Sequence, residues 1–272
     1  AGQHLVYRAS EAAGTDGVCG LRESGAALAG APQPSGGGTM ALDVKVCRIA
    51  CDADFEYYAL NGSSVAATAA DIEMILNGVS AIYELDTGVS FQITQILVRS
   101  AEPDPYTAAN VDGLLAEFRA QWRSGHPDIP RDLAQLFTGR SFGSILGNGY
   151  VSQVCPGWDH YSLVRSRWQA DLGKRIALSA HEIGHNLDAV HCDYGADPRC
   201  RIMCPSLGGC SNGYHSFEAL NISRIRDRLA KADCLTAGTV TTPSTSLPFS
   251  DNFDAISYPP QLPDPARWTA AD

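Results

Sequence analysis

One short segment constrains this chain more than any other, because it determines where several polar side chains must meet. Residues 181–191 read HEIGHNLDAVH, with histidines at 181, 185 and 191 and a glutamate at 182. Positions four apart lie on the same face of a helix, so His181 and His185 can bind one metal ion. Glu182 then lies beside that ion, where it can take a proton from a water molecule that the ion activates.

The third histidine predicts how the segment folds. His191 is six residues after His185, and at about 100° per residue a continuing helix would carry it far round the cylinder. We therefore expect the helix to end after about Asn186 and the chain to turn back toward the ion. Three imidazoles leave a fourth position for water, as in catalytic zinc sites. A bare HExxH also arises by chance in surface helices, an alternative that the third histidine weakens.

A second motif lies downstream, at residues 201–205, with the sequence RIMCP. Together the two segments resemble the metzincin metallopeptidases, whose signature is HExxHxxGxxH followed by a methionine-containing turn beneath the metal. The resemblance implies a zinc cofactor and a set of site residues: the zinc ligands His181, His185 and His191, the general base and acid Glu182, and the turn methionine Met203.

One position departs from that signature. The glycine that ends the helix in this family is Asp188 here. Glycine suits a chain reversal because it takes positive φ without penalty, and aspartate is among the few other residues that visit this region readily. We expect a cost of about 1 kcal/mol in backbone strain and an intact metal site.

Over residues 41–236 the chain resembles the adamalysin (reprolysin) branch of the metzincins. The resemblance rests on residues 136–140, 147–155, 203–205 and 232–235 and, more loosely, 52–58. No tyrosine stands two residues after Met203, which disfavours the astacin and serralysin branches. Cys192 stands where adamalysins usually carry aspartate. The first strand has no match for the adamalysin calcium-site glutamate, so the sequence gives calcium no support.

Hydrophobic periodicity predicts the order of the elements. Alternation and β-branched content favour strands at 41–51, 89–98, 133–137, 144–155 and 161–165. Helical spacing favours helices at 72–83 and 111–125, a metal-binding helix from about 170, and a last helix at 216–232 that begins at Ser216 and turns Phe217, Leu220, Ile225 and Leu229 inward. The fold class expected is α+β. The resemblance implies a twisted mixed sheet of about five strands with long helices, and a zinc cleft between N- and C-terminal subdomains.

The chain has nine cysteines, which indicates an oxidising compartment outside the cytosol, and we expect a secreted protein. We interpret eight as structural thiols. Four of them surround the metal-binding segment, where disulfides can staple an irregular loop: Cys192, Cys200, Cys204 and Cys210. A second zinc site is the alternative, which their spacing disfavours.

Two further pairs of cysteines lie outside this group. Cys47 and Cys51 lie about 13 Å apart along a strand, too far to bond each other, and their partners stay unassigned. The adamalysin resemblance implies a disulfide between Cys155 and Cys234, which ties a sheet strand to the end of the last helix.

The ninth cysteine, Cys19, lies in a Gly- and Ala-rich stretch ahead of a linker at 31–39. A thiolate is a strong zinc ligand, so a propeptide cysteine can fill the water position and silence the enzyme. Metzincin zymogens use a Cys-Gly element in this way. The alternative is a thiol, unattached or disulfide-bonded, in a disordered tail. We predict a propeptide and linker at 1–40, a zinc metallopeptidase domain at 41–236, and at 237–272 a Thr/Ser/Pro linker with the start of a β-sandwich module.

Composition limits the partners. A net charge of −10 argues against nucleic-acid and anionic-membrane surfaces, and no apolar run approaches the length of a membrane span. We expect a monomer whose partners are its own propeptide and a protein or peptide substrate. The substrate lies extended along an exposed edge strand within 144–155. Residues 205–210 are expected to shape the pocket just beyond the cut.

Several other polar residues carry weaker signals. The remaining histidines, His4, His126, His160 and His215, are more often surface or capping residues than ligands. Asn61 and Asn221 begin glycosylation sequons, which are common and matter only in a eukaryotic secretory route.

Two classes of function remain. The first is an active, secreted zinc endopeptidase made as a latent zymogen with Cys19 on the zinc. The second is a non-catalytic metal-binding interaction module that has kept the fold. Glu182 favours the first, because a module without activity has no need of that carboxylate.

Overall fold

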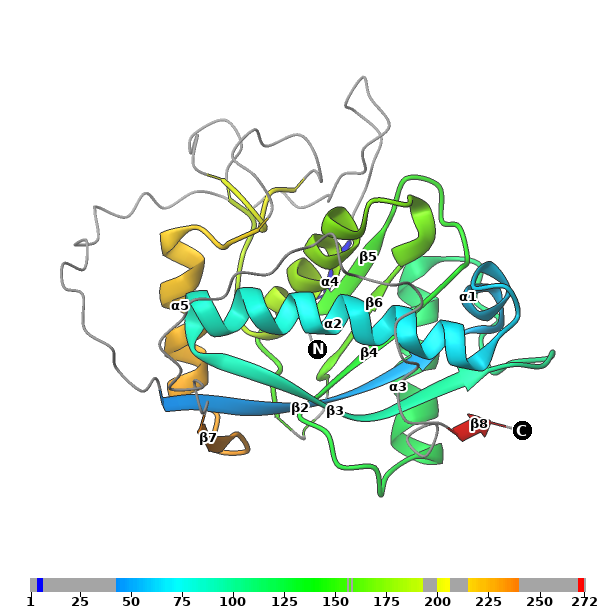
Figure 1. Cartoon of the computed structure of the whole chain (residues 1–272), viewed down its shortest axis with the longest axis horizontal. Helices are drawn as coiled ribbons and strands as arrows, with labels where there is room; N and C mark the ends of the chain where they lie inside the picture. The colour runs from blue at the N-terminus through cyan, green and yellow to red at the C-terminus, as the bar shows by residue number, and fades with distance from the viewer. Residues whose placement is uncertain are drawn as a thin grey trace, which may run out of the picture.

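The centre of the structure, a computed structural model, is a twisted mixed sheet (Figure 1). The residues described are 4–6, 43–155, 157, 159–192, 200–205, 215–239 and 269–271. The main strands, in the order in which they lie side by side, are β5 (Gly147–Tyr150), β6 (Tyr161–Val164), β4 (Leu133–Phe137), β2 (Asp43–Ala53) and β3 (Val89–Arg99). All run parallel except β5, which is antiparallel to β6. The predicted α+β fold with a mixed sheet is confirmed.

Three short strands extend this sheet. β7 (Thr236–Thr239) pairs antiparallel with the start of β2. At the two ends of the sheet, β1 (His4–Val6) pairs antiparallel with β5, and β8 (Thr269–Ala271) pairs parallel with β3. Both outer edges of the five main strands therefore accept an added strand.

Helices cover both faces of the sheet. α2 (Val65–Thr87) and α4 (Leu172–Asn186) pack together on one face, and α5 (Ala219–Ala230) contacts α2. α3 (Val111–Gly125) packs on the other face (Figure 1). The two shortest helices are α1 (Phe55–Leu60) and the 3₁₀ turn η1 (Ser166–Trp168). The result is a three-layer arrangement, and His181 and His185 lie in the layer that holds α2 and α4.

Strand alternation explains why the sheet has two cores. Side chains of successive strand residues point to opposite faces. In β2, Cys47, Ile49 and Cys51 lie in the cluster with α2 and α4, whereas Ala50 lies in the cluster with Phe118 and other α3 residues. The β2 face toward α2 and α4 is therefore apolar, whereas the face toward α3 also carries the buried Asp52, which accepts from Trp122 and pairs with Arg99.

The helix predicted at 72–83 is longer than the periodicity indicated. It begins after Ser64, whose Oγ accepts from the Ala67 amide, and ends before Gly88, at φ 75°. α2 is long and apolar enough to cross a membrane by length and composition alone. Its residues Ile72, Ile75 and Val79 are fully buried in the core of this domain, which is the environment of a core helix.

The strand predicted over 144–155 is confirmed only for Gly147–Tyr150, so the prediction is wrong for 144–146 and beyond Tyr150. The chain leaves the sheet there because Ser152 and Cys155 have positive φ, at 58° and 86°. The amides of Ser152, Gln153 and Val154 then donate to the carbonyls of His185 and Asn186 instead of to a neighbouring strand. The strand is short because the following residues bond to the end of α4.

The start predicted for the last helix is also wrong. The N-cap position of α5 is Glu218, without a side-chain capping bond, and Ser216 Oγ instead accepts from Arg201 Nη1 at 2.6 Å. Of the four residues expected to face inward, Leu220 is 48% exposed, whereas Phe217, Ile225 and Leu229 are buried.

The cysteines follow the expectations only in part. Cys155–Cys234 and Cys192–Cys200 are disulfides, and Cys204 is disulfide-bonded as well. Cys47 and Cys51 do not bond each other, as predicted, but both are free, so counting them among the structural disulfides is wrong. Burial raises the pKa of both thiols, which keeps them protonated as small apolar side chains of the core.

Candidate metal centre

The helix that carries the first two histidines ends where their spacing predicted. α4 begins after Asp171, whose Oδ1 accepts from the Lys174 amide at 3.2 Å, and its last residue is Asn186. The Asp188 amide donates to the His185 carbonyl, and the Ala189 amide donates to the Gly184 carbonyl at 2.8 Å. This pair of bonds is a Schellman motif, which needs a left-handed residue just past the helix. Asp188 takes that conformation, with φ 76°.

The turn brings the three predicted histidines together. Their ligand atoms all lie within 4.8 Å of one another. His181 Nε2 lies 3.0 Å from His185 Nε2 and 3.2 Å from His191 Nε2. Nitrogen ligands about 2.0–2.1 Å from a tetrahedral zinc ion lie about 3.3 Å apart. The two separations from His181 are therefore close to those between zinc ligands.

The other ring nitrogens hold these imidazoles in place. His181 Nδ1 lies 2.7 Å from the Ile202 carbonyl oxygen, and His185 Nδ1 lies 3.0 Å from that of Ala189. A carbonyl accepts only from a protonated nitrogen, so each bond leaves Nε2 unprotonated, with its lone pair toward the centre.

Burial keeps the rings neutral. It lowers the pKa of His181 and His185 well below the ordinary value, with smaller contributions from the neighbouring histidines. Burial likewise lowers the pKa of His191 to about 4. Neutral imidazole is the form that binds a metal ion, so the donor set fits zinc at neutral pH.

Glu182 is buried beside this cluster without a polar partner on one oxygen. The residue is 1% exposed, and its Oε1 has no hydrogen-bond partner among the described residues. Burial raises its pKa well above the usual range. A cation at the three histidines would act in the opposite direction and favour the carboxylate. An orphaned carboxylate oxygen is costly unless a ligand satisfies it.

The backbone of β5 lies directly against this carboxylate. A Cβ built on Gly147 would meet Glu182 Oε1 at 2.3 Å, and one built on Gly149 would meet the Glu182 carbonyl oxygen at 3.2 Å. The two glycines thus leave room for Glu182 between α4 and β5. The sequence did not single them out for this contact.

Met203 lies on the other side of α4. It is fully buried, and its Sδ would lie 2.9 Å from a Cβ on Gly184, between the two histidines of the helix. Its carbonyl accepts from the Cys192 amide at 3.0 Å, next to His191. The segment around Met203 therefore contacts both α4 and the residue that follows His191.

Other predicted residues lie elsewhere. Cys19 and most of 205–210 lie outside the described residues. His126 occupies the C-cap position of α3, as expected of a capping residue.

His160 is 4% exposed and stacks on Tyr161, so the prediction that it is a surface histidine is wrong. Burial lowers the pKa of His160 to about 4. Within the described ranges, the three site histidines are the group of potential ligands that could hold a metal ion.

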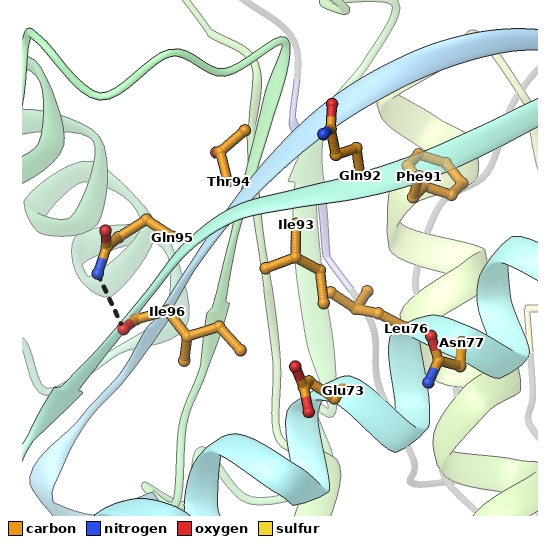
Figure 2. A pocket seen from close by; sticks show the side chains of 9 residues that line it. All are labelled: Glu73, Leu76, Asn77, Phe91, Gln92, Ile93, Thr94, Gln95 and Ile96. Carbon is orange, nitrogen blue, oxygen red and sulfur yellow. Dashed lines mark hydrogen bonds between the residues drawn. The ribbon is translucent and has the colours of Figure 1, made fainter. Parts of the chain in front are cut away.

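A cavity of about 590 Å³ lies at the opposite end of the sheet from β5, between β3 and α2. Figure 2 shows Leu76 of α2 pointing toward Ile93 of β3, with Glu73 and Asn77 on the same helix. The cavity has no part in the histidine site.

The two sequon asparagines are buried and bonded. Asn61 is 6% exposed, donates to the Tyr57 carbonyl and accepts from Arg167. Asn221 is fully buried and bonds Val190 through both side-chain atoms. Neither amide is free to carry a glycan in the folded domain.

Replacing one histidine tests the geometry directly. We expect His185→Ala to lower bound zinc from about one ion per chain to a small fraction of that, because three nitrogen ligands are the minimum of a catalytic site. Native mass spectrometry measures the bound metal. His126→Ala is the matched control, since His126 lies outside the cluster, and equal zinc in the two variants would contradict the assignment.

Comparison with known proteins gives one family match and several relatives. Residues 43–221 match the model of metallo-peptidase family M12, of the reprolysin type. Disintegrin and metalloproteinase domain-containing protein 33 of Homo sapiens is 26% identical over 215 residues, which cover 76% of this chain and 26% of that protein. Zinc metalloproteinase recombinant fibrinogenase II of Deinagkistrodon acutus is 33% identical over 126 residues, covering 43% of this chain and 52% of that protein. The chain thus spans a quarter to a half of these relatives' lengths.

Proposed function

Because this chain belongs to metallopeptidase family M12, we propose that it is a secreted zinc endopeptidase that hydrolyses peptide bonds in proteins. One observation carries the proposal: three Nε2 atoms converge beside a buried carboxylate oxygen that has no partner among the described residues. This arrangement supports the proposal because catalytic zinc sites combine three such donors with a nearby general base.

The residues present divide the chemistry between them. His181, His185 and His191 would hold the zinc, which supplies a Lewis acid that acidifies water and polarises a carbonyl. Glu182 takes the proton from the attacking water and delivers it to the leaving amine, as a general base and then a general acid. The Glu182 side chain is buried, which keeps bulk water away from this carboxylate. Met203 packs beneath α4 and supports its position.

The substrate is proposed to bind along the outer edge of β5. This strand lies against Glu182, and its outer edge pairs antiparallel with β1 in the register His4–Tyr150, Leu5–Gly149 and Val6–Asn148. An edge that accepts one extended segment offers the same main-chain hydrogen bonds to another. A substrate in this position lies with its backbone next to the general base.

The same pairing supports a latent form. Residues 4–6 fall within the segment proposed as a propeptide at 1–40, and they occupy the edge that a substrate needs. We propose that this segment and Cys19 together silence the domain at 41–236, with Cys19 as the zinc ligand in the latent form. Residues 237–272 are proposed as a linker and the start of a further module.

Disulfides agree with an oxidising compartment. The described residues contain Cys155–Cys234 and Cys192–Cys200, and reducing compartments rarely keep such bonds. Secretion is proposed on this ground.

The test of the function is hydrolysis of casein after limited proteolysis of the chain. We expect no activity before trimming, activity after removal of the 1–40 segment, and loss of activity on adding a zinc chelator. A trimmed, zinc-loaded chain that releases no peptides would refute the enzyme and favour the non-catalytic metal-binding module.

The role of Cys19 has its own test. We expect Cys19→Ser to yield a precursor that activates itself during purification, because serine is a far weaker zinc ligand than thiolate. Activity and N-terminal sequencing over time measure this. Cys47→Ser is the matched control, since Cys47 is a free, buried thiol of the core; a Cys19→Ser precursor as latent as the parent would refute the switch.

A further inference from the structure

The third histidine is held by a turn that lacks its usual glycine. Asp188 has φ 76°, a conformation in which non-glycine residues are strained. The turn also fixes His185, because the Ala189 carbonyl oxygen lies 3.0 Å from His185 Nδ1. A turn that relaxed toward ordinary φ would therefore disturb two of the three histidines.

One side chain contacts both polar groups of the strained residue. Arg224, on α5, donates from Nε to the Asp188 carbonyl oxygen at 2.7 Å, and its Nη2 lies 3.0 Å from Asp188 Oδ2. A guanidinium presents its donors in a rigid fork, so these two contacts fix the carbonyl and the carboxylate relative to each other. Glycine at this position would offer only the carbonyl.

A second side chain of the same helix fixes the next part of the turn. Asn221 Oδ1 accepts from the Val190 amide at 2.9 Å, and its Nδ2 donates to the Val190 carbonyl at 2.8 Å. Val190 directly precedes His191. Asn221 and Arg224 are separated by three positions and so lie on one face of α5, which presents both to the turn. The first turns of α5 thus bind the peptide units that lead to the third histidine.

The contacts between Arg224 and Asp188 are partly exposed, with side chains 37% and 31% accessible. An exposed ion pair by itself adds little to stability. Here the pair is expected to restrict the backbone conformation of Asp188, because one of the two contacts of Arg224 is with the Asp188 carbonyl oxygen. The pair is expected to matter for the metal site more than for the global fold.

We propose that Arg224 is a positioning residue for the metal centre: it holds Asp188 in the left-handed conformation and so keeps His185 and His191 in place without the glycine. The proposal rests on the zinc site of the proposed function but not on peptide hydrolysis. It predicts that the need for Arg224 disappears when Asp188 is replaced by glycine, which takes the conformation unaided.

A double-mutant cycle on zinc affinity tests this. Zinc affinity is measured by competition with a chromophoric chelator for the trimmed parent, Arg224→Ala, Asp188→Gly and the double variant. We expect Arg224→Ala to weaken zinc binding about 10-fold or more in the parent, in the range of other residues that orient metal ligands, and less than about 3-fold in the Asp188→Gly chain. Arg226→Ala is the matched control, since this arginine of α5 donates to the Asp86 carbonyl away from the site.

The outcomes separate the two proposals. Equal losses in both backgrounds, or no loss in the parent, would overturn the role of Arg224 while leaving the zinc enzyme intact. A parent that binds no zinc would overturn both. The cobalt-substituted proteins give a second readout: the ligand-field spectrum is expected to change in Arg224→Ala, to be unchanged in Arg226→Ala, and to be restored in the double variant.

Discussion

Replacing Glu182 by glutamine is expected to lower kcat/KM for a peptide substrate by about 10²–10⁴-fold, the range that a positioned general acid–base contributes. The amide is nearly the same size as the carboxylate, so the contact with β5 stays, but it cannot accept the proton from water. Because the zinc ligands are untouched, we expect about one zinc ion per chain in the variant. Cleavage of a fluorogenic peptide by the trimmed protein and its zinc content measure the two effects.

Glu84→Gln is a suitable control for this substitution, since Glu84 lies on α2 and accepts from Ser80. Its activity is expected to equal that of the parent. A Glu182→Gln protein that keeps parental activity with full zinc would remove Glu182 from the mechanism.

Substituting alanine for Gly147 is expected to lower kcat/KM by about 10²-fold, the loss that a misplaced catalytic group can cause. The new methyl group would lie 2.3 Å from Glu182 Oε1 and 2.6 Å from its Cδ, so the carboxylate must move. These atoms are the far end of a flexible side chain, so the movement costs little stability. We expect the activity to fall while the temperature of unfolding changes by only a few degrees.

Gly139→Ala provides the contrast. Its methyl group would lie 2.4 Å from the carbonyl carbon of Glu56, which is backbone and has no freedom to move aside. We expect this variant to lose stability, by about 1–3 kcal/mol, because overpacking then strains the chain. Full activity in Gly147→Ala, or equal loss of stability in the two variants, would contradict the placement of the Glu182 carboxylate against β5.

The parts of the site that the sequence could predict are those governed by helical geometry. The spacing of His181 and His185 requires a helix, and the position of His191 requires that helix to end, so the end at Asn186 followed from the ligands alone. The positive φ at Asp188 was expected instead from the resemblance, because the metzincin signature has glycine at this position. A metal ion shared by several side chains is a strong constraint, because it requires residues at helical spacing and residues beyond the helix to meet at one point.

The remaining features depend on contacts between distant segments. β5 is short because amides 152–154 bond to carbonyls at the end of α4, and nothing in the local alternation signals that exchange. Arg224 lies 36 residues after Asp188, and its helix position alone gives no hint of a partner. Likewise, Cys47 and Cys51 are free core residues of β2. The nine cysteines of the chain and the expected oxidising compartment had suggested that both form disulfides.

The pairing of β1 with β5 connects the fold to the proposed regulation. Residues 4–6, distant in sequence from the histidines, lie along the strand that packs on Glu182, so the proposed substrate binding and the proposed latency would involve the same edge. The sequence predicted an edge strand for substrate and a separate inhibitory segment. It had no means of indicating that the segment pairs with that strand.

The most direct test of the central claim is a zinc titration of the trimmed, metal-free chain, followed at each step by bound zinc and by the rate of peptide cleavage. If His181, His185 and His191 hold the catalytic ion, both signals rise together and reach their plateau at about one zinc per chain, as a single open site requires. Zinc binding that saturates at that ratio while the cleavage rate stays at zero would contradict the account.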